Sequence, residues 1–87
     1  MTAQWQVYLL ECRDGSLYCG ITNNLEHRLE MHNQGKASKY TRSRLPVRLA
    51  AVCPTEGRSQ ALKLEYRIKR LPKNQKIKQL NQENKKP

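Results

Sequence analysis

A β-hairpin near the N-terminus limits the possible folds of this chain more than any other segment. Two short apolar segments, Trp5 to Cys12 and Leu17 to Thr22, flank the turn Arg13-Asp14-Gly15. Apolar segments rich in β-branched and aromatic residues on both sides of an Asp-Gly pair are typical of a hairpin. The first segment is apolar on both alternations, which predicts a central strand that is covered on both faces.

Each predicted strand carries one tyrosine, and the length of the turn decides whether the two rings share a face. A two-residue Asp14-Gly15 loop would place Tyr8 and Tyr18 on opposite faces, because side chains alternate along a strand. A three-residue loop with Gly15 in the left-handed conformation pairs Tyr8 with Gly20 and places both phenols on one face. The Asp-Gly pair suits both turns. We favour the three-residue loop because it also sets Tyr8 opposite a residue without a side chain.

The segments after the hairpin predict three helices and one more strand, which lies between the first and second helices. Asn23 and Glu26 have the spacing of a capping box, so a helix is expected from Asn24 to about Asn33. A third strand is then expected from Val47 to Cys53. We further expect a helix capped by Ser59 that runs to about Leu71, before Pro72, and a short helix from Lys73 to about Gln82.

These elements fit in one domain of the α+β class, with the order β-β-α-β-α-α. The 87-residue chain is short enough that we assign residues 1–83 to this single domain and residues 84–87 to a frayed basic tail.

The charged residues are distributed unevenly along the chain. Residues 1–35 hold two basic and four acidic side chains, net −2, whereas residues 36–87 hold fifteen basic and three acidic side chains, net +12. This asymmetry indicates a polyanionic partner, and nucleic acid before a membrane, because no apolar run approaches the length that spans a bilayer. On composition alone, a soluble protein with solvated lysines is an equal alternative.

The segment from Gln34 to Leu45 is predicted to be a polar, basic loop with one aromatic residue. Basic side chains interleaved with an aromatic ring suit a nucleic-acid backbone and the face of a base or sugar. An ordinary surface loop explains the same composition equally well. The candidate nucleic-acid-binding residues of this loop are Tyr40, Lys36, Lys39, Arg42 and Arg44.

The three cysteines indicate a reducing compartment. Cys12, Cys19 and Cys53 lie in apolar segments and lack the C-x-x-C spacing of a metal or redox site. We expect them to be small buried hydrophobic residues and not a disulfide framework or a zinc site. The N-terminus has no basic region that leads into an apolar run, so a secretory signal is not expected. A cytoplasmic location is therefore predicted.

The order of several residues resembles the GIY-YIG nuclease superfamily. Val7-Tyr8-Leu9, followed about ten residues later by Tyr18-Cys19-Gly20, is similar to the two-part signature of that superfamily. The similarity continues through Arg28 and His32 to a late Glu65 on a predicted helix. The segment EYRIKRLPKNQK and the length of the chain are similar to the small stand-alone bacterial members known as the UPF0213, or YhbQ-like, group.

The resemblance implies a fold, an activity and a set of site residues. The fold is a three-stranded antiparallel sheet flanked by helices, and the activity is metal-dependent hydrolysis of phosphodiester bonds in DNA, in repair or processing. Glu65 would hold one divalent cation, Mg²⁺ with Mn²⁺ as the alternative, and Arg28 would neutralise charge on the scissile phosphate. Tyr8 and Tyr18 would position and deprotonate the attacking water, and His32 would accept or relay a proton. Tyr40 matches a position that contacts the phosphate region.

The chain departs from the pattern of the superfamily at two places. Ile21 stands where some members carry a lysine, so that cationic contact would have to come from Lys36 or Lys39. Some members also use an asparagine after the glutamate, for which Asn74 and Asn81 are candidates. We expect DNA before RNA as the substrate, and a protein partner that supplies specificity, because one small domain leaves no second DNA-reading part.

A second interpretation is a non-catalytic DNA- or RNA-binding module on the same fold. Singly, tyrosines in strands usually pack, and a lone glutamate at the margin of a helix stripe usually pairs with a neighbouring base, here Lys69 or Arg58. Glu65 favours the enzyme, because binding of phosphate alone gains nothing from an added negative charge.

Overall fold

The computed structural model describes residues 4–85, and its centre is a three-stranded antiparallel sheet. The strands are β1 (Gln6–Glu11), β2 (Leu17–Thr22) and β3 (Arg48–Pro54), and their order in the sheet is β2-β1-β3. The hairpin strand β1 is therefore central, as the apolar character of both its faces predicted. The predicted α+β class with a three-stranded antiparallel sheet is confirmed.

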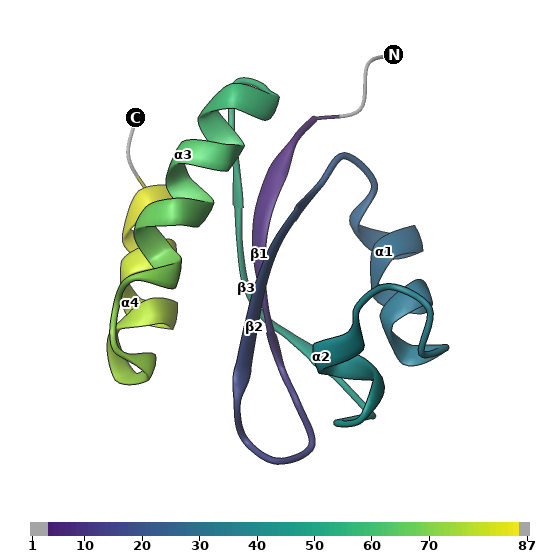
Figure 1. The fold of residues 1–87 in the computed structure, drawn as a ribbon. Helices are drawn as coiled ribbons and strands as arrows, with labels where there is room; N and C mark the ends of the chain where they lie inside the picture. The colour runs from purple at the N-terminus through teal and green to yellow at the C-terminus, as the bar shows by residue number, and fades with distance from the viewer. Residues whose placement is uncertain (1–3, 86–87) are drawn as a thin grey trace.

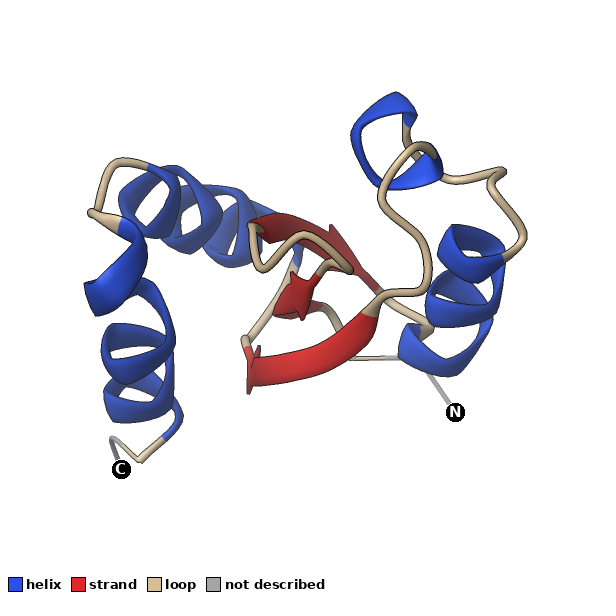
Figure 2. Ribbon diagram, turned by 90° about the horizontal axis from the view of Figure 1, so that it is seen from below, coloured by secondary structure: helices blue, strands red, loops and turns tan. Residues whose placement is uncertain are grey.

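Within the described residues, four helices cover the two faces of the sheet. They are α1 (Leu25–Asn33), α2 (Lys39–Arg42), α3 (Arg58–Lys69) and α4 (Lys73–Asn84). Figure 1 shows α3 and α4 on one face of the sheet and α1 and α2 on the other, and Figure 2 shows the same three layers from below. None of these helices combines the length and the apolar character needed to cross a membrane.

The hairpin has the register of the three-residue loop. Tyr8 lies opposite Gly20, and Leu10 lies opposite Tyr18. The Cys12 N–H donates to the Ser16 carbonyl at 2.9 Å, and Gly15 has a φ of 84°. Because a positive φ is costly for a residue with a Cβ, glycine is the suitable residue at this point of the turn. Both tyrosines consequently lie on one face of the sheet, as predicted.

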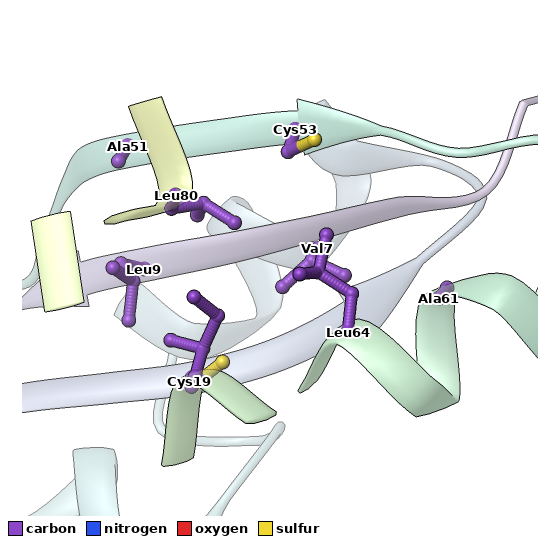
Figure 3. Close-up of a cluster of buried hydrophobic side chains, with 9 residues drawn as sticks. Val7, Leu9, Cys19, Ala51, Cys53, Ala61, Leu64 and Leu80 are labelled. Carbon is purple, nitrogen blue, oxygen red and sulfur yellow. The ribbon is translucent and has the colours of Figure 1, made fainter. Parts of the chain in front are cut away.

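The alternation of β1 divides the buried residues into two clusters. Figure 3 shows the cluster between the sheet and the helices α3 and α4, which contains Val7, Leu9, Cys19, Ala51, Cys53, Ala61, Leu64, Ile68 and Leu80. The second cluster contains Tyr8, Leu10, Cys12 and Val47, with Leu25 and Leu29 of α1 packed against it. Each buried Leu, Ile or Val contributes about 1.5–3 kcal/mol relative to an exposed one. All three cysteines are buried, as expected from their apolar surroundings.

A β-bulge explains why β3 alternates poorly in sequence. Leu9 pairs with Ala51, but the next residue of β1, Leu10, pairs with Leu49. One residue of β3, Ala50, is therefore extra, and the residues before it are shifted by one relative to the face they would otherwise occupy.

The structure corrects both predicted helix caps. Asn24, and not Asn23, caps α1, because its side chain accepts a hydrogen bond from the His27 N–H at 3.2 Å. The helix α3 begins at Arg58, two residues earlier than a Ser59 cap would require, and its cap position, Gly57, has no side-chain cap. Several adjacent residues compete as caps at both sites, and the local sequence does not distinguish them.

Two boundaries also differ from the prediction. The segment expected to be a loop contains the four-residue helix α2, which is capped by the Ser38 side chain. The last helix continues to Asn84, so the predicted tail over residues 84–87 is helical at its first residue. Residues 86–87 of that tail, and residues 1–3 of the predicted domain, lie outside the described residues.

Candidate active site

The centre of the candidate site is a buried chain of three polar side chains from β1, α1 and α2. The Tyr8 hydroxyl lies 2.9 Å from Nε2 of His32, and Nδ1 of His32 lies 2.8 Å from Oγ1 of Thr41. Tyr8 and His32 are 2% and 1% exposed. The hairpin register directs Tyr8 toward α1, and one turn of α1 separates Arg28 from His32. The fold thus brings together two of the residues that the resemblance selected.

Gly20 provides the space that the Tyr8 ring occupies. A Cβ at this position would lie 2.5 Å from the Tyr8 hydroxyl oxygen and 3.1 Å from a ring carbon of Tyr18. Contacts below 3.0 Å require an atom to move, so the absence of a side chain at Gly20 allows Tyr8 to reach His32. Opposite Gly20, the phenol fills the space left by the missing side chain.

Tyr18 belongs to an aromatic cluster on the open side of Tyr8. The Tyr18 ring lies 5.0 Å from His32, 6.3 Å from Tyr8 and 6.2 Å from Tyr40, with which it is stacked. The Arg44 guanidinium lies 3.9 Å from the centre of the Tyr40 ring. Tyr18 is half-buried, so it is more accessible to a substrate than Tyr8.

The structure separates the basic candidates of the loop into two kinds. Lys36, Lys39 and Arg42 are exposed, and their side chains make no hydrogen bond or ion pair within residues 4–85. Arg44 instead donates to Asp14 at 3.0 Å and to the Tyr40 carbonyl at 2.8 Å. Arg44 therefore supports Tyr40 and the hairpin turn, and the other three cations are the ones available to phosphates.

Arg28 lies on the exposed side of α1 and acts on the buried pair through its charge. Burial raises the pKa of Tyr8 and the neighbouring Tyr18 adds to this, while the Arg28 guanidinium opposes the increase. Burial also lowers the pKa of His32, and the charge of Arg28 adds to that decrease. Both groups are therefore held neutral, and Arg28 is close enough to stabilise negative charge on the phenol.

Glu65 lies on α3, on the other face of the sheet from His32, yet its charge reaches the same site. Its side chain is 18% exposed, and one carboxylate oxygen lies 3.5 Å from Nζ of Lys69. Burial raises the pKa of the Cys19 thiol on β2 to about 12, and the Glu65 carboxylate adds to that shift. Glu65 also adds slightly to the raised pKa of Tyr8, behind burial and Tyr18. The expected ion pair of Glu65 with Lys69 is thus present. Glu65 also lies near the edge strand β2, which carries Cys19.

A single carboxylate at Glu65 would suit a hard cation better than zinc. Among the described residues, no group of three or more His, Cys, Asp and Glu side chains is arranged to hold a metal ion. Zinc sites in proteins normally need three or four such ligands. Mg²⁺ retains several waters and takes only one or two carboxylates from the protein, so a single Glu65 suits its chemistry. The candidate asparagines, Asn74 and Asn81, are exposed on α4.

Thr41 is the site residue that the sequence did not reveal. Its hydroxyl contacts His32, yet it lies in a polar segment where one threonine among lysines and arginines has no distinguishing pattern. A helix of only four residues also gives no periodicity to detect.

The chain is similar in sequence to known proteins over most of its length. The GIY-YIG catalytic domain family matches residues 4–81. The UPF0213 protein OB0043 of Oceanobacillus iheyensis is 54% identical over 78 residues, which cover 90% of this chain and 91% of that protein. A UPF0213 protein of Nitratidesulfovibrio vulgaris is 53% identical over 73 residues, which cover 84% of this chain and 66% of that protein.

Two solution NMR structures also resemble the fold. The protein EF2693 from E. faecalis is 38% identical with a TM-score of 0.64, covering 94% of this chain and 90% of that one. The UPF0213 protein BH0048 from Bacillus halodurans is 36% identical with a TM-score of 0.56, covering 94% of this chain and 87% of that one.

Proposed function

Because this chain belongs to the GIY-YIG family of nuclease domains, we propose that it is a metal-dependent nuclease that hydrolyses phosphodiester bonds in DNA. The observation that carries the proposal is the hydrogen bond between Tyr8 and His32 at 2.9 Å, within electrostatic reach of the exposed Arg28 guanidinium. A phenol, an imidazole and an arginine in this arrangement can remove a proton from water and stabilise a phosphate.

Tyr8 and His32 form the acid–base pair of the proposed reaction. A phenol is a weak base while it is protonated, because its ordinary pKa is near 10 and burial raises the pKa of Tyr8 further. His32 offers an acceptor 2.9 Å away. As water attacks phosphorus, its proton passes to the Tyr8 oxygen and the Tyr8 proton passes to Nε2 of His32. The bond from phosphorus to the leaving oxygen breaks, and that oxygen takes a proton from solvent.

Tyr18 and Arg28 act on the substrate in this proposal. Tyr18 is half-buried next to Tyr8 and positions the attacking water, whereas the Tyr8 oxygen is buried in the free protein. Binding of the substrate must therefore open the space in front of Tyr8. The planar guanidinium of Arg28 can donate to two phosphate oxygens at once. A divalent cation held by Glu65 would supply a Lewis acid that stabilises charge on the phosphate oxygens.

Nucleic acid is the proposed partner because of the charge around the site. Arg28, Lys36, Lys39 and Arg42 are all exposed on the side of the sheet that carries α1 and α2. These side chains can contact successive phosphates without reading base sequence. We therefore propose a structure-directed activity on DNA, with repair or processing as the setting, in the cytoplasm.

The test separates catalysis from binding through Glu65. Labelled duplex, nicked, flap and single-stranded DNA, and RNA, are incubated with Mg²⁺, Mn²⁺ or EDTA, and the parent is compared with Glu65→Gln. We expect the parent to cleave DNA only with metal, and Glu65→Gln to be slower by about 10²-fold or more, the loss typical when one preorganised charge-stabilising group is removed. Its DNA affinity should stay equal or increase slightly, because a negative charge leaves a phosphate-binding surface.

A matched variant controls for charge and folding. Glu56→Gln removes the same charge from an exposed loop residue before α3 and should keep the parent rate. Circular dichroism must show that Glu65→Gln is folded, because Glu65 borders the buried Leu64. Parent-like cleavage by a folded Glu65→Gln would contradict the metal role. A parent that binds DNA but cleaves nothing on the panel would replace the nuclease with a binding module on this fold.

A further inference from the structure

Thr41 lies at the far end of a series of buried hydrogen bonds that begins at Tyr8 and passes through His32. Thr41 is 0% exposed, and its Oγ1 lies 2.8 Å from Nδ1 of His32. The same hydroxyl donates to the Ser38 carbonyl at 3.4 Å. Within the described residues, no buried side-chain nitrogen or oxygen is left without a partner. The chain therefore runs from Tyr8 through both ring nitrogens of His32 to Thr41 and the backbone of α2.

Only one arrangement of protons satisfies every member of this chain. With the proton of His32 on Nδ1, Tyr8 donates to Nε2, Nδ1–H donates to Thr41, and Thr41 donates to the Ser38 carbonyl. With the proton on Nε2, that N–H would donate to the Tyr8 oxygen, and the Tyr8 hydroxyl proton would have no acceptor within residues 4–85. A buried donor without an acceptor costs about 1–3 kcal/mol, so the first arrangement is favoured.

We propose that Thr41 is a positioning residue that holds His32 in the Nδ1–H tautomer, so that Nε2 is directed at Tyr8 as a proton acceptor. This inference rests on the proposed function for its catalytic meaning. In the other tautomer, Nε2 already carries a proton and cannot take the one that Tyr8 releases. Thr41 thus decides whether the buried pair can work as a base, although it touches neither Tyr8 nor the substrate phosphate.

The short helix α2 places Thr41 at this point. The Ser38 hydroxyl accepts from the Tyr40 N–H at 3.1 Å and starts the helix, and the Ser38 carbonyl accepts from both Thr41 and the Arg42 N–H. The bond from the Arg13 N–H to the Arg44 carbonyl at 2.9 Å attaches the end of this segment to the hairpin turn. The basic segment therefore also supports His32 through Thr41.

The tautomer can be measured without any activity. In protein labelled with ¹⁵N, long-range ¹H–¹⁵N correlations distinguish a protonated ring nitrogen from an unprotonated one. The chain has two histidines, and the exposed His27 is an internal control in the same spectrum. We expect His32 of the parent to show a protonated Nδ1 and an unprotonated Nε2 at neutral pH. An Nε2–H tautomer in the parent would overturn the proposal, whether or not the protein cleaves DNA.

Two variants then connect the tautomer to catalysis. Thr41→Val keeps the shape but removes the acceptor, so it should shift His32 toward the Nε2–H tautomer and lower the cleavage rate at saturating DNA by about tenfold or more. Thr41→Ser keeps a hydroxyl and should restore both the tautomer and the rate, while DNA affinity stays the same in all three proteins. A folded Thr41→Val that retains the Nδ1–H tautomer would overturn the proposal. If Thr41→Val does not fold, the spectra of Thr41→Ser and the parent test the proposal instead. An Nε2–H tautomer in the folded Thr41→Ser protein would also overturn it.

Discussion

At the scale of single residues, the chemistry of Tyr8 depends on three neighbours that lie 12 to 24 residues after it in the sequence. Gly20 leaves the space for its ring, His32 offers an acceptor for its proton, and Arg28 supplies the positive charge that favours its ionised form. Burial acts against that ionisation. A tyrosine in a strand becomes a candidate base only because these three conditions meet at one oxygen atom.

Gly20→Ala is predicted to separate Tyr8 from His32. The new methyl group would lie 2.5 Å from the Tyr8 oxygen, so the phenol must move. We expect DNA cleavage to be lost and the free energy of unfolding to fall by about 1–3 kcal/mol, as in other overpacked cores. Urea unfolding measures the stability, and the same labelled DNA panel measures the cleavage.

A control of similar stability shows whether the loss is local. Cys53→Ala removes buried volume from the cluster under α3 and α4, away from Tyr8, and should reduce stability while retaining cleavage. If Gly20→Ala cleaves DNA as well as Cys53→Ala does, the space at Gly20 is not required by the site.

At the scale of elements, the site depends on contacts between a hairpin and a segment that follows 30 residues later. Arg44 forms an ion pair with Asp14 in the hairpin turn at 3.0 Å and also lies over the Tyr40 ring. This pair is partly exposed, so its own contribution to stability is small, about 0–1 kcal/mol. Its structural consequence is larger, because it orders the segment that carries both Tyr40 and Thr41.

The N-cap residue of α3, the helix that carries Glu65, is a glycine whose replacement can stabilise the helix. Gly57 is extended, a Cβ there would meet nothing within 4 Å, and the first turn of α3 contains no acidic residue. Gly57→Asp should therefore add a side-chain acceptor for the free N–H groups and a favourable charge at the helix N-terminus. We expect it to be more stable than the parent, and about 1 kcal/mol more stable than Gly57→Ala, in urea unfolding. Equal stability of the Asp and Ala variants would show that this end of α3 needs no cap.

At the scale of the whole molecule, the two halves of the chain differ in charge and in what they contribute. Residues 1–35, net −2, supply Tyr8, Tyr18, Arg28 and His32, whereas residues 36–87, net +12, supply Glu65 and most of the cations. The fold places the free cations of the α2 segment on the same side of the sheet as His32. In the proposed function, affinity and chemistry would thus be provided mainly by different parts of the sequence.

Nucleic-acid affinity is predicted to depend strongly on salt. If about five phosphates are contacted, the logarithm of the association constant for duplex DNA should fall with the logarithm of salt concentration with a slope of about −4 to −5. Lys36→Ala and Lys39→Ala should each make the slope shallower by about 0.9. Lys78→Ala, in α4 on the opposite face of the sheet, should leave it unchanged. A slope near zero in fluorescence anisotropy titrations would remove nucleic acid as the partner.

The sequence by itself determined the hairpin, the central position of β1, the burial of the three cysteines and the presence of the helix α3. These features follow from short-range rules: alternation in strands, the 3.6-residue period of helices and the turn preference of Asp-Gly. Residue order alone also identified the family and selected Tyr8 and His32. Local chemistry left two turn lengths open, and our reason for preferring one was the space opposite Tyr8.

The tertiary structure decided what these residues can do together. Tyr8 and His32 are 24 residues apart, His32 and Thr41 are 9 apart, and Arg44 and Asp14 are 30 apart. No periodicity relates such pairs, because their contact depends on the hairpin register, the packing of α1 and the short helix α2 at once. The cap residue of α1, the start of α3 and the bulge in β3 were also visible only in the structure. The hydrogen bonds from Tyr8 to His32 and from His32 to Thr41 therefore exist only in the folded protein, because they join β1, α1 and α2.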